Sequence, residues 1–230
     1  MLKNYVFIIF TAVILLGACV KSNNGRNQDH AQEQEEVQEQ DHFLPQAVEP
    51  LSEEIIKKIT GKSYKDNASI AYSDLVYLTI PYINFNGESC VGNMIVAAHL
   101  GKEVLDIFQE LYENRFPIYK MQLIDYYDAD DNLSMEDNNT SAFNYRYIAN
   151  TARISNHGYG IAIDINPVQN PYITNYAILP PAGTGYLDRG YVRKGMIVKG
   201  DVCYRAFISR GWTWGGDWST PKDYQHFEKR

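Results

Sequence analysis

The stretch SNHGYGIAIDINP (residues 155–167) decides how the chain is interpreted, because one charged residue stands inside an apolar run. Ile161, Ala162, Ile163 and Ile165 have the residue types of a buried strand, and Asp164 interrupts them. A carboxylate in such a strand costs several kcal/mol to desolvate unless it is paired or coordinated. Asp164 therefore requires a partner, either a basic side chain in a structural salt bridge or a metal ion.

Two histidines provide the ligands that a metal would need beside this aspartate. His157 comes just before glycines that permit a tight reversal, which would bring it back toward Asp164. His226 lies near the C-terminus, three residues after Asp223. Two imidazoles, one carboxylate and an open position for water form a common catalytic zinc site, and a further carboxylate then serves as the base. The sequence offers all four groups.

Both motifs resemble those of one enzyme family. The pattern S-x-H-x-x-G-x-A-x-D-I (155–165) resembles the zinc motif of the M15 metallopeptidases, the D-alanyl-D-alanine carboxypeptidases of the VanY type and the related L-alanyl-D-glutamate endopeptidases. The segment DYQHFE (223–228) resembles the family signature DxxHFE, and WGGDW (214–218) is similar to the segment that precedes it. A looser likeness covers about residues 75–230. The two motifs in this order are a specific signal, whereas either one alone would be weak.

The resemblance implies roles for individual residues. Zinc would be held by His157, Asp164 and His226, with Asp223 as general base. The family uses an upstream arginine to steady the carbonyl oxygen of the substrate, and Arg146 in SAFNYRYI (141–148) matches that position.

Further candidates lie beside the motifs. Arg153 is the second candidate for the arginine that steadies the carbonyl oxygen. Candidate substrate contacts, for which a turn or core role is the alternative, are Ser155, Trp214, Asp217 and Trp218.

The function implied by the resemblance is hydrolysis of peptidoglycan stem peptides by a zinc enzyme. A D-alanyl-D-alanine carboxypeptidase is the first hypothesis, and an L-alanyl-D-glutamate endopeptidase is its alternative. A zinc-stabilised cell-wall binding module without turnover is the hypothesis from another class. Asp223 and Arg146 favour the enzyme, because a pure binding site needs neither a base nor an oxyanion partner.

The N-terminus has the features of an export signal. Lys3 precedes the apolar run YVFIIFTAVILLGA (5–18), which has the length of a signal-peptide core. The residues Leu-Gly-Ala-Cys (16–19) resemble a bacterial lipobox, which predicts a signal peptide over 1–18 and lipidation of Cys19. We therefore expect an extracytoplasmic protein anchored to a bacterial membrane by lipid. The alternatives are a secreted protein with an incidental cysteine and an uncleaved membrane anchor.

Composition separates a tether from a globular domain. Residues 19–50 are rich in Gln, Glu, Asn and Asp and predict a flexible tether, in which His30 and His42 are solvated. Residues 51–230 then form the metallopeptidase-like domain. The first 19 residues add one positive charge and residues 20–50 add five net negative charges, which leaves −3 of the total −7 for the domain. The domain sequence has no cluster of basic residues, so we do not expect a nucleic-acid partner.

Periodicity gives a coarse reading of the domain. Apolar spacing predicts a helix over 95–114, in which His99 is structural or exposed, and a strand over 118–127. Residues 128–140 are acidic and predict a solvated loop rather than a calcium site, and residues 167–200 predict an irregular but ordered loop beside the site.

A second helix is predicted over 201–210, with Asp201 as N-cap and Gly211 at the stop. Early helices, short strands around the motif and no βαβ alternation favour an α+β fold with a small antiparallel sheet and flanking helices. The family resemblance implies the hedgehog/D-Ala-D-Ala-peptidase-like zinc fold. Whether Cys90 and Cys203 pair stays open.

Overall fold

A computed structural model of the chain describes residues 44–149 and 151–229. The helices are α1 (Glu53–Ile59), α2 (Gly101–Glu113), α3 (Asp131–Glu136) and α4 (Val202–Ile208). The strands are β1 (Ala47–Pro50), β2 (Leu75–Ile83), β3 (Ser89–Ala97), β4 (Lys120–Met121), β5 (Asn139–Thr140), β6 (Ala162–Asp164), β7 (Tyr172–Ile173), β8 (Ile178–Leu179), β9 (Thr213–Trp214), β10 (Lys222–Asp223) and β11 (His226–Glu228). Short 3-10 turns are η1 (Tyr72–Asp74), η2 (Ala98–Leu100), η3 (Ile124–Tyr127), η4 (Asn156–Tyr159), η5 (Pro181–Tyr186) and η6 (Gly215–Asp217).

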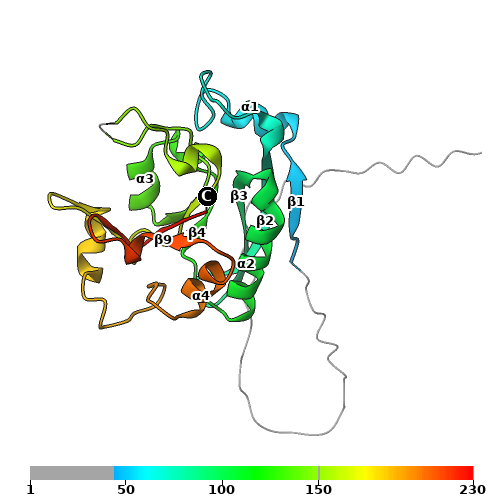
Figure 1. The fold of residues 1–230 in the computed structure, drawn as a ribbon. Coiled ribbons are helices and arrows are strands. Elements are labelled where there is room, and N and C mark those ends of the chain that lie inside the picture. The colour runs from blue at the N-terminus through cyan, green and yellow to red at the C-terminus, as the bar shows by residue number, and fades with distance from the viewer. Residues whose placement is uncertain (1–43, 150, 230) are drawn as a thin grey trace, which may run out of the picture.

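The longest strands form an antiparallel sheet in the order β1-β2-β3, and α2 packs against it (Figure 1). β2 and β3 pair along their whole length, from Leu75 opposite Ala97 to Ile83 opposite Ser89. Helix α2 approaches this sheet closely because Gly101 has no side chain, and a Cβ there would lie 2.7 Å from Val76. This sheet supplies the platform on which the rest of the domain packs.

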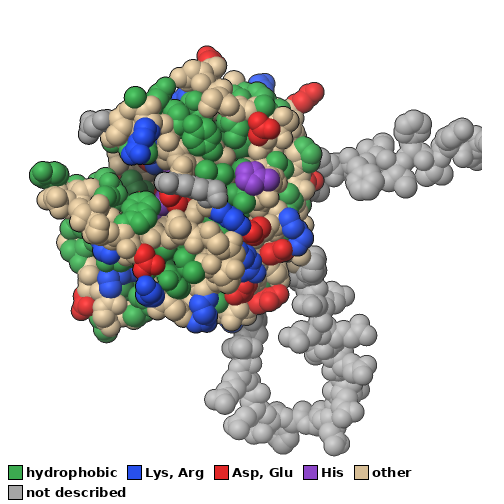
Figure 2. All heavy atoms as spheres, viewed as in Figure 1, with side chains coloured by type: hydrophobic (Ala, Val, Ile, Leu, Met, Phe, Trp, Pro, Cys, Tyr) green, Lys and Arg blue, Asp and Glu red, His purple; other side chains and the backbone are tan. Residues whose placement is uncertain are grey.

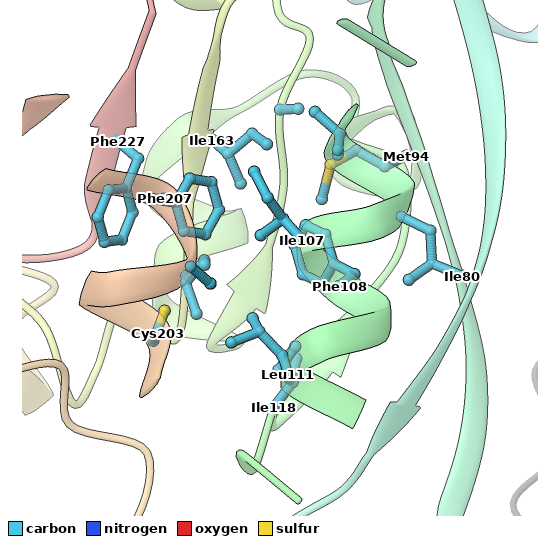
Figure 3. Packing of buried hydrophobic residues seen from close by; sticks show 14 of the residues in the cluster. Ile80, Met94, Ile107, Phe108, Leu111, Ile118, Ile163, Cys203, Phe207 and Phe227 are labelled. Carbon is cyan, nitrogen blue, oxygen red and sulfur yellow. The ribbon is translucent and has the colours of Figure 1, made fainter. Parts of the chain in front are cut away.

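The main hydrophobic core lies between α2, α4 and the strands that carry the two motifs (Figure 3). Ile107 and Phe108 of α2 are buried against Phe207 of α4. The Phe207 ring stacks on Phe227 of β11, with ring centroids 4.1 Å apart, and Ile163 of β6 belongs to the same core. The core therefore holds β6 and β11 against the helices and fixes their relative position.

Two smaller antiparallel sheets surround the motifs. One has the order β6-β11-β9 and the other the order β10-β7-β8, while β4 and β5 pair in parallel. This arrangement of small antiparallel sheets and few helices agrees with the predicted α+β class. Acidic and basic side chains are interspersed on the face shown in Figure 2.

The long helix expected over 95–114 begins later than predicted. Residues 95–97 belong to β3, and α2 starts at Gly101. Ile95 is buried opposite Tyr77, and its carbonyl accepts a hydrogen bond from Phe143 N at 3.1 Å. A fully buried strand and a helix are both apolar, so periodicity does not separate them. His99 is exposed in η2, as a surface histidine would be.

The strand predicted over 118–127 is wrong for most of its length. Only β4 forms, and Ile124–Tyr127 is a 3-10 turn. The backbone N–H of Tyr119 donates to Asn166 Oδ1, and that of Gln122 donates to Asn139 Oδ1, both at 2.9 Å. Side-chain amides from distant segments thus satisfy backbone groups that a sheet would otherwise satisfy.

The acidic segment 128–140 also differs from the predicted loop. It contains α3, whose N-cap Asp130 accepts from Asn132 N and Leu133 N through Oδ1. Asp128 pairs with Lys62 at its edge. The four aspartates of this segment cap the helix or form ion pairs.

The expectation that helices come early is only partly right, since the longest strands, β2 and β3, also precede α2. The sheet begins inside the predicted tether, because β1 lies before residue 51 and pairs with β2.

The second predicted helix is confirmed as α4, with Asp201 Oδ1 accepting from Tyr204 N at 2.7 Å. Residues 167–200 are irregular apart from β7, β8 and η5. Cys203 is a free, buried thiol, so it does not pair with Cys90. No helix within the described residues has the length and apolarity to cross a membrane.

Candidate metal centre

Three side chains from separate segments meet at one point. The antiparallel register of β6 and β11 places His226 opposite Asp164, and η4 brings His157 beside them. His226 Nδ1 lies 2.9 Å from Asp164 Oδ1, and His157 Nε2 lies 3.2 Å from Asp164 Oδ2. The two histidines are 3.2 Å apart, measured from His157 Nε2 to His226 Nδ1. Among the described residues, these three form the group whose ligand atoms could hold a metal ion, all within 4.8 Å of one another.

Local structure orients His157. Ser155 caps η4 by accepting from His157 N through Oγ at 3.3 Å. His157 Nδ1 lies 2.6 Å from the carbonyl oxygen of Ala142 and donates to it, which turns Nε2 toward the other two residues. Gly160 ends the turn with φ of +67°, and a Cβ there would lie 2.5 Å from Ala97 N. The close approach of η4 to β3 therefore requires glycine at this position.

These residues fit a zinc ion. The outer nitrogen of each imidazole has an oxygen acceptor: Ala142 O for His157 and, at 3.2 Å, Glu228 Oε2 for His226. When the outer nitrogens hold the protons, the inner nitrogens can present lone pairs that converge with the Asp164 carboxylate. Three acceptors about 3 Å apart repel one another unless a cation lies between them. Tetrahedral zinc with bonds of about 2.0–2.1 Å separates its ligands by about 3.3–3.4 Å, close to these spacings.

The electrostatics of the site also favour a cation. Burial opposes ionisation of Asp164, but His157 and His226 outweigh it and hold the pKa of this carboxyl far below its ordinary value. Burial likewise disfavours the charged form of His226, yet Asp164 and Glu228 raise its pKa to about 10. Positive charge is thus stabilised at the point where the three ligand atoms meet.

Asp223 lies next to this group, and one of its carboxylate oxygens makes no hydrogen bond to the described residues. It belongs to β10, opposite Tyr172. Gly215 lets β10 approach, because a Cβ there would lie 2.5 Å from Asp223 O. Asp223 Oδ1 is buried without a hydrogen-bond partner among the described residues. Burial raises the pKa of Asp223 to about 7, against the lowering effect of His226 and together with the raising effect of Asp164. A carboxyl with one buried oxygen that has no partner among the described residues is suited to proton transfer near neutral pH.

The two candidate arginines lie in different surroundings. Arg146 forms an ion pair with Asp131 at the start of α3, and both side chains are one-third exposed. Its Nε is buried without a partner among the described residues. Its carbonyl accepts from Ser155 N at 2.9 Å, which connects its segment to η4. Arg153 is exposed.

The candidate substrate contacts fall into two groups. Ser155 and Trp214 are buried, and each has a structural hydrogen bond, Ser155 to His157 N and Trp214 Nε1 to Tyr224 O at 2.8 Å. Asp217 is exposed and pairs with Lys199, whereas the Trp218 ring lies 5.4 Å from the His226 ring. Of the two candidate tryptophans, Trp218 is therefore the one whose ring lies beside a candidate metal ligand. Cys19 lies outside the described residues.

Sequence reasoning assigned no role to the groups that orient the ligands. The Ala142 carbonyl leaves no signal, because every residue has one. Glu228 does leave a signal, since residues two apart in a strand share a face and Glu228 stands two residues after His226.

Comparison with known families agrees with the motif. Residues 149–229 match the family model described as D-alanyl-D-alanine carboxypeptidase, of the M15 family. The predicted resemblance is confirmed over this segment, which contains the three candidate metal ligands and Asp223. No curated protein and no solved structure matches the chain.

Proposed function

With the match to the D-alanyl-D-alanine carboxypeptidase family as the premise, we propose that the chain is a zinc peptidase that removes the terminal D-alanine from peptidoglycan stem peptides. The proposal includes the hedgehog/D-Ala-D-Ala-peptidase-like zinc fold. One observation carries it: ligand atoms of the buried His157 and His226 and of the partly buried Asp164 converge beside a buried carboxylate oxygen of Asp223 that has no partner among the described residues. A purely structural metal site does not require the fourth group.

Each residue has a distinct task in the proposed reaction. His157, Asp164 and His226 would hold zinc, which when bound would supply Lewis-acid chemistry and lower the pKa of the reacting water. Asp223 accepts a proton from the attacking water through Oδ1 and delivers it to the leaving amine. The Nε–H of Arg146, which has no partner among the described residues, would donate to the carbonyl oxygen of the substrate as negative charge develops there.

The site of action is also a proposal, and it rests on the N-terminal sequence. Lipid on Cys19 would hold the enzyme outside the cytoplasm, on a bacterial membrane, with residues 20–46 as a spacer. Its substrate, the peptidoglycan stem peptide, lies in that compartment.

The direct test is digestion of defined muropeptides by the purified, zinc-loaded chain, followed by mass spectrometry. Loss of one terminal D-alanine is the expected result. A cut between L-alanine and D-glutamate would replace the carboxypeptidase assignment with an endopeptidase. An intact muropeptide after long incubation would contradict the enzyme and favour the zinc-stabilised binding module.

Asp223→Ala separates chemistry from metal binding. We expect the variant to keep its zinc and to lose about 10²–10⁴-fold in the rate of muropeptide cleavage, because the base is absent. Asp106→Ala is the matched control, since Asp106 lies in α2 and pairs with the exposed Lys102. Cleavage by Asp223→Ala at the rate of the control would contradict the proposed mechanism.

A further inference from the structure

Glu228 is a nearly buried carboxylate that contacts both halves of the metal motif. Its side chain lies beside His226, with Glu228 Oε2 3.2 Å from His226 Nε2. The same oxygen accepts a hydrogen bond from Asn156 Nδ2 at 2.6 Å. Asn156 immediately precedes His157 and is 72 residues from Glu228 in the sequence. One oxygen atom thus joins the segment of one histidine ligand to the ring of the other.

The local structure explains how these contacts arise. In β11 the side chains of His226 and Glu228 point to the same face, because the strand period is two. Glu228 pairs across the sheet with Ala162 and is 9% exposed. A buried carboxylate is costly unless charge-assisted hydrogen bonds stabilise it, and the imidazole and the amide supply two.

We propose that Glu228 is a positioning residue of the metal centre, which fixes the His226 ring with Nδ1 toward the metal and ties β11 to the His157 segment through Asn156. The inference rests on the proposed zinc site. An acceptor at Nε2 keeps the proton on that nitrogen and leaves the lone pair on Nδ1, the atom that lies 2.9 Å from Asp164 Oδ1. A carboxylate also makes the ring a stronger donor to a metal than a neutral acceptor would.

The test measures zinc affinity in the full chain by competition with a chromophoric chelator. Glu228→Ala removes both hydrogen bonds, so we expect zinc to bind about 10–100-fold more weakly. Glu228→Gln keeps an oxygen that can accept both bonds but removes the charge, so we expect it to recover most of the affinity and to remain several-fold weaker than wild type. The absorption spectrum of the cobalt(II)-substituted protein should shift in both variants, because the ring orientation and basicity change.

Glu103→Gln is the matched control for loss of a carboxylate that anchors the same end of the chain. Glu103 accepts from Lys229 Nζ at 2.7 Å and from Trp212 Nε1 at 2.7 Å, and Lys229 directly follows Glu228. This control should bind zinc as wild type does and keep the cobalt spectrum. An equal loss of zinc affinity in Glu103→Gln and Glu228→Ala would overturn the positioning role, because the effect would then come from the strand end in general.

Wild-type zinc affinity together with an unshifted cobalt spectrum in Glu228→Ala would also overturn the inference. If that variant does not fold, the same criteria apply to Glu228→Gln. His226→Ala, measured alongside, separates this inference from the proposed function. If His226→Ala loses zinc while Glu228→Ala keeps full affinity, only the role of Glu228 fails, and if His226→Ala keeps zinc, the ligand set itself is wrong.

Discussion

The aspartate in the strand of the first motif finds its partners in the folded chain. Asp164 contacts both His157 and His226, and the cross-strand register brings His226 directly opposite it. The sequence leaves two possible partners for it, a structural salt bridge or a metal ion, and the side chains that pair with this carboxylate are those of two histidines, which are also possible metal ligands. A carboxylate that would destabilise an ordinary strand becomes favourable where it shares a cation with two imidazoles.

Arg146 is the residue whose proposed role depends most on its surroundings. Asp131 pairs with its guanidinium, and Nε is buried without a partner among the described residues, so the proposed role assigns the substrate to this unused donor. We expect Arg146→Ala to keep zinc and to lower kcat for muropeptide cleavage by about 10²–10³-fold, the loss typical of an oxyanion donor.

Arg153→Ala is the comparison variant for this prediction, because Arg153 is exposed and follows Arg146 on the same connection. Steady-state kinetics of the two variants should differ in kcat. If Arg153→Ala loses more activity than Arg146→Ala, the oxyanion role belongs to Arg153.

At the scale of elements, the 3-10 turn η4 must lie against β3 for His157 to reach the centre. Gly160 makes this possible, since its carbonyl accepts from Ala97 N at 2.9 Å and its φ is +67°. We expect Gly160→Ala to lower the free energy of unfolding by about 2–5 kcal/mol, from the left-handed backbone and the clash with Ala97 combined. Chemical denaturation of the two proteins measures this difference.

Gly61→Ala provides the control, because Gly61 has φ of +80° and no atom within 4 Å of an added Cβ. It should cost only the backbone penalty, about 1–2 kcal/mol. Equal losses of unfolding free energy in the two variants would mean that the close packing of η4 on β3 adds nothing to the cost of Gly160→Ala.

Elements whose start and end are marked by their own neighbouring residues could be predicted from the sequence. Helix α4 is one, because its cap Asp201 and its stop Gly211 stand at its own ends. The region 118–127 could not, because its backbone partners are the side chains of Asn139 and Asn166, which only the fold brings near.

The same distinction holds for the site. The two motifs and their family resemblance point to His157, Asp164 and His226, and these three side chains do meet at one point in the structure. Two contacts that orient them, between the Ala142 carbonyl and His157 and between Asn156 and Glu228, become visible only once distant segments are placed together.

At the scale of the whole molecule, one hydrophobic core packs the β1-β2-β3 sheet against strands β6 and β11, which carry Asp164 and His226. Phe227 follows His226 directly and stacks on Phe207 of α4, which in turn packs on Phe108 of α2. The ligand in β11 is therefore held by the main core rather than by a surface loop. Such rigid support is what a preorganised metal site requires.

The predicted anchor concerns the whole chain rather than its domain. If Cys19 carries lipid, Cys19→Ser should move the protein from the membrane fraction to the soluble extracytoplasmic fraction, because one acyl-bearing residue supplies the anchorage. Fractionation of cells that express either form measures this change. A Cys19→Ser protein that stays with the membrane would indicate an uncleaved apolar anchor instead.

The zinc content of the purified full chain tests the central claim most directly. Elemental analysis after dialysis should give about one zinc per wild-type chain, and His226→Ala should lose it, because two ligands remain of the usual three. His99→Ala, which removes an exposed histidine from η2, should keep the wild-type content. A wild-type chain without zinc, or a His226→Ala variant with as much zinc as wild type, would contradict the proposed metal centre.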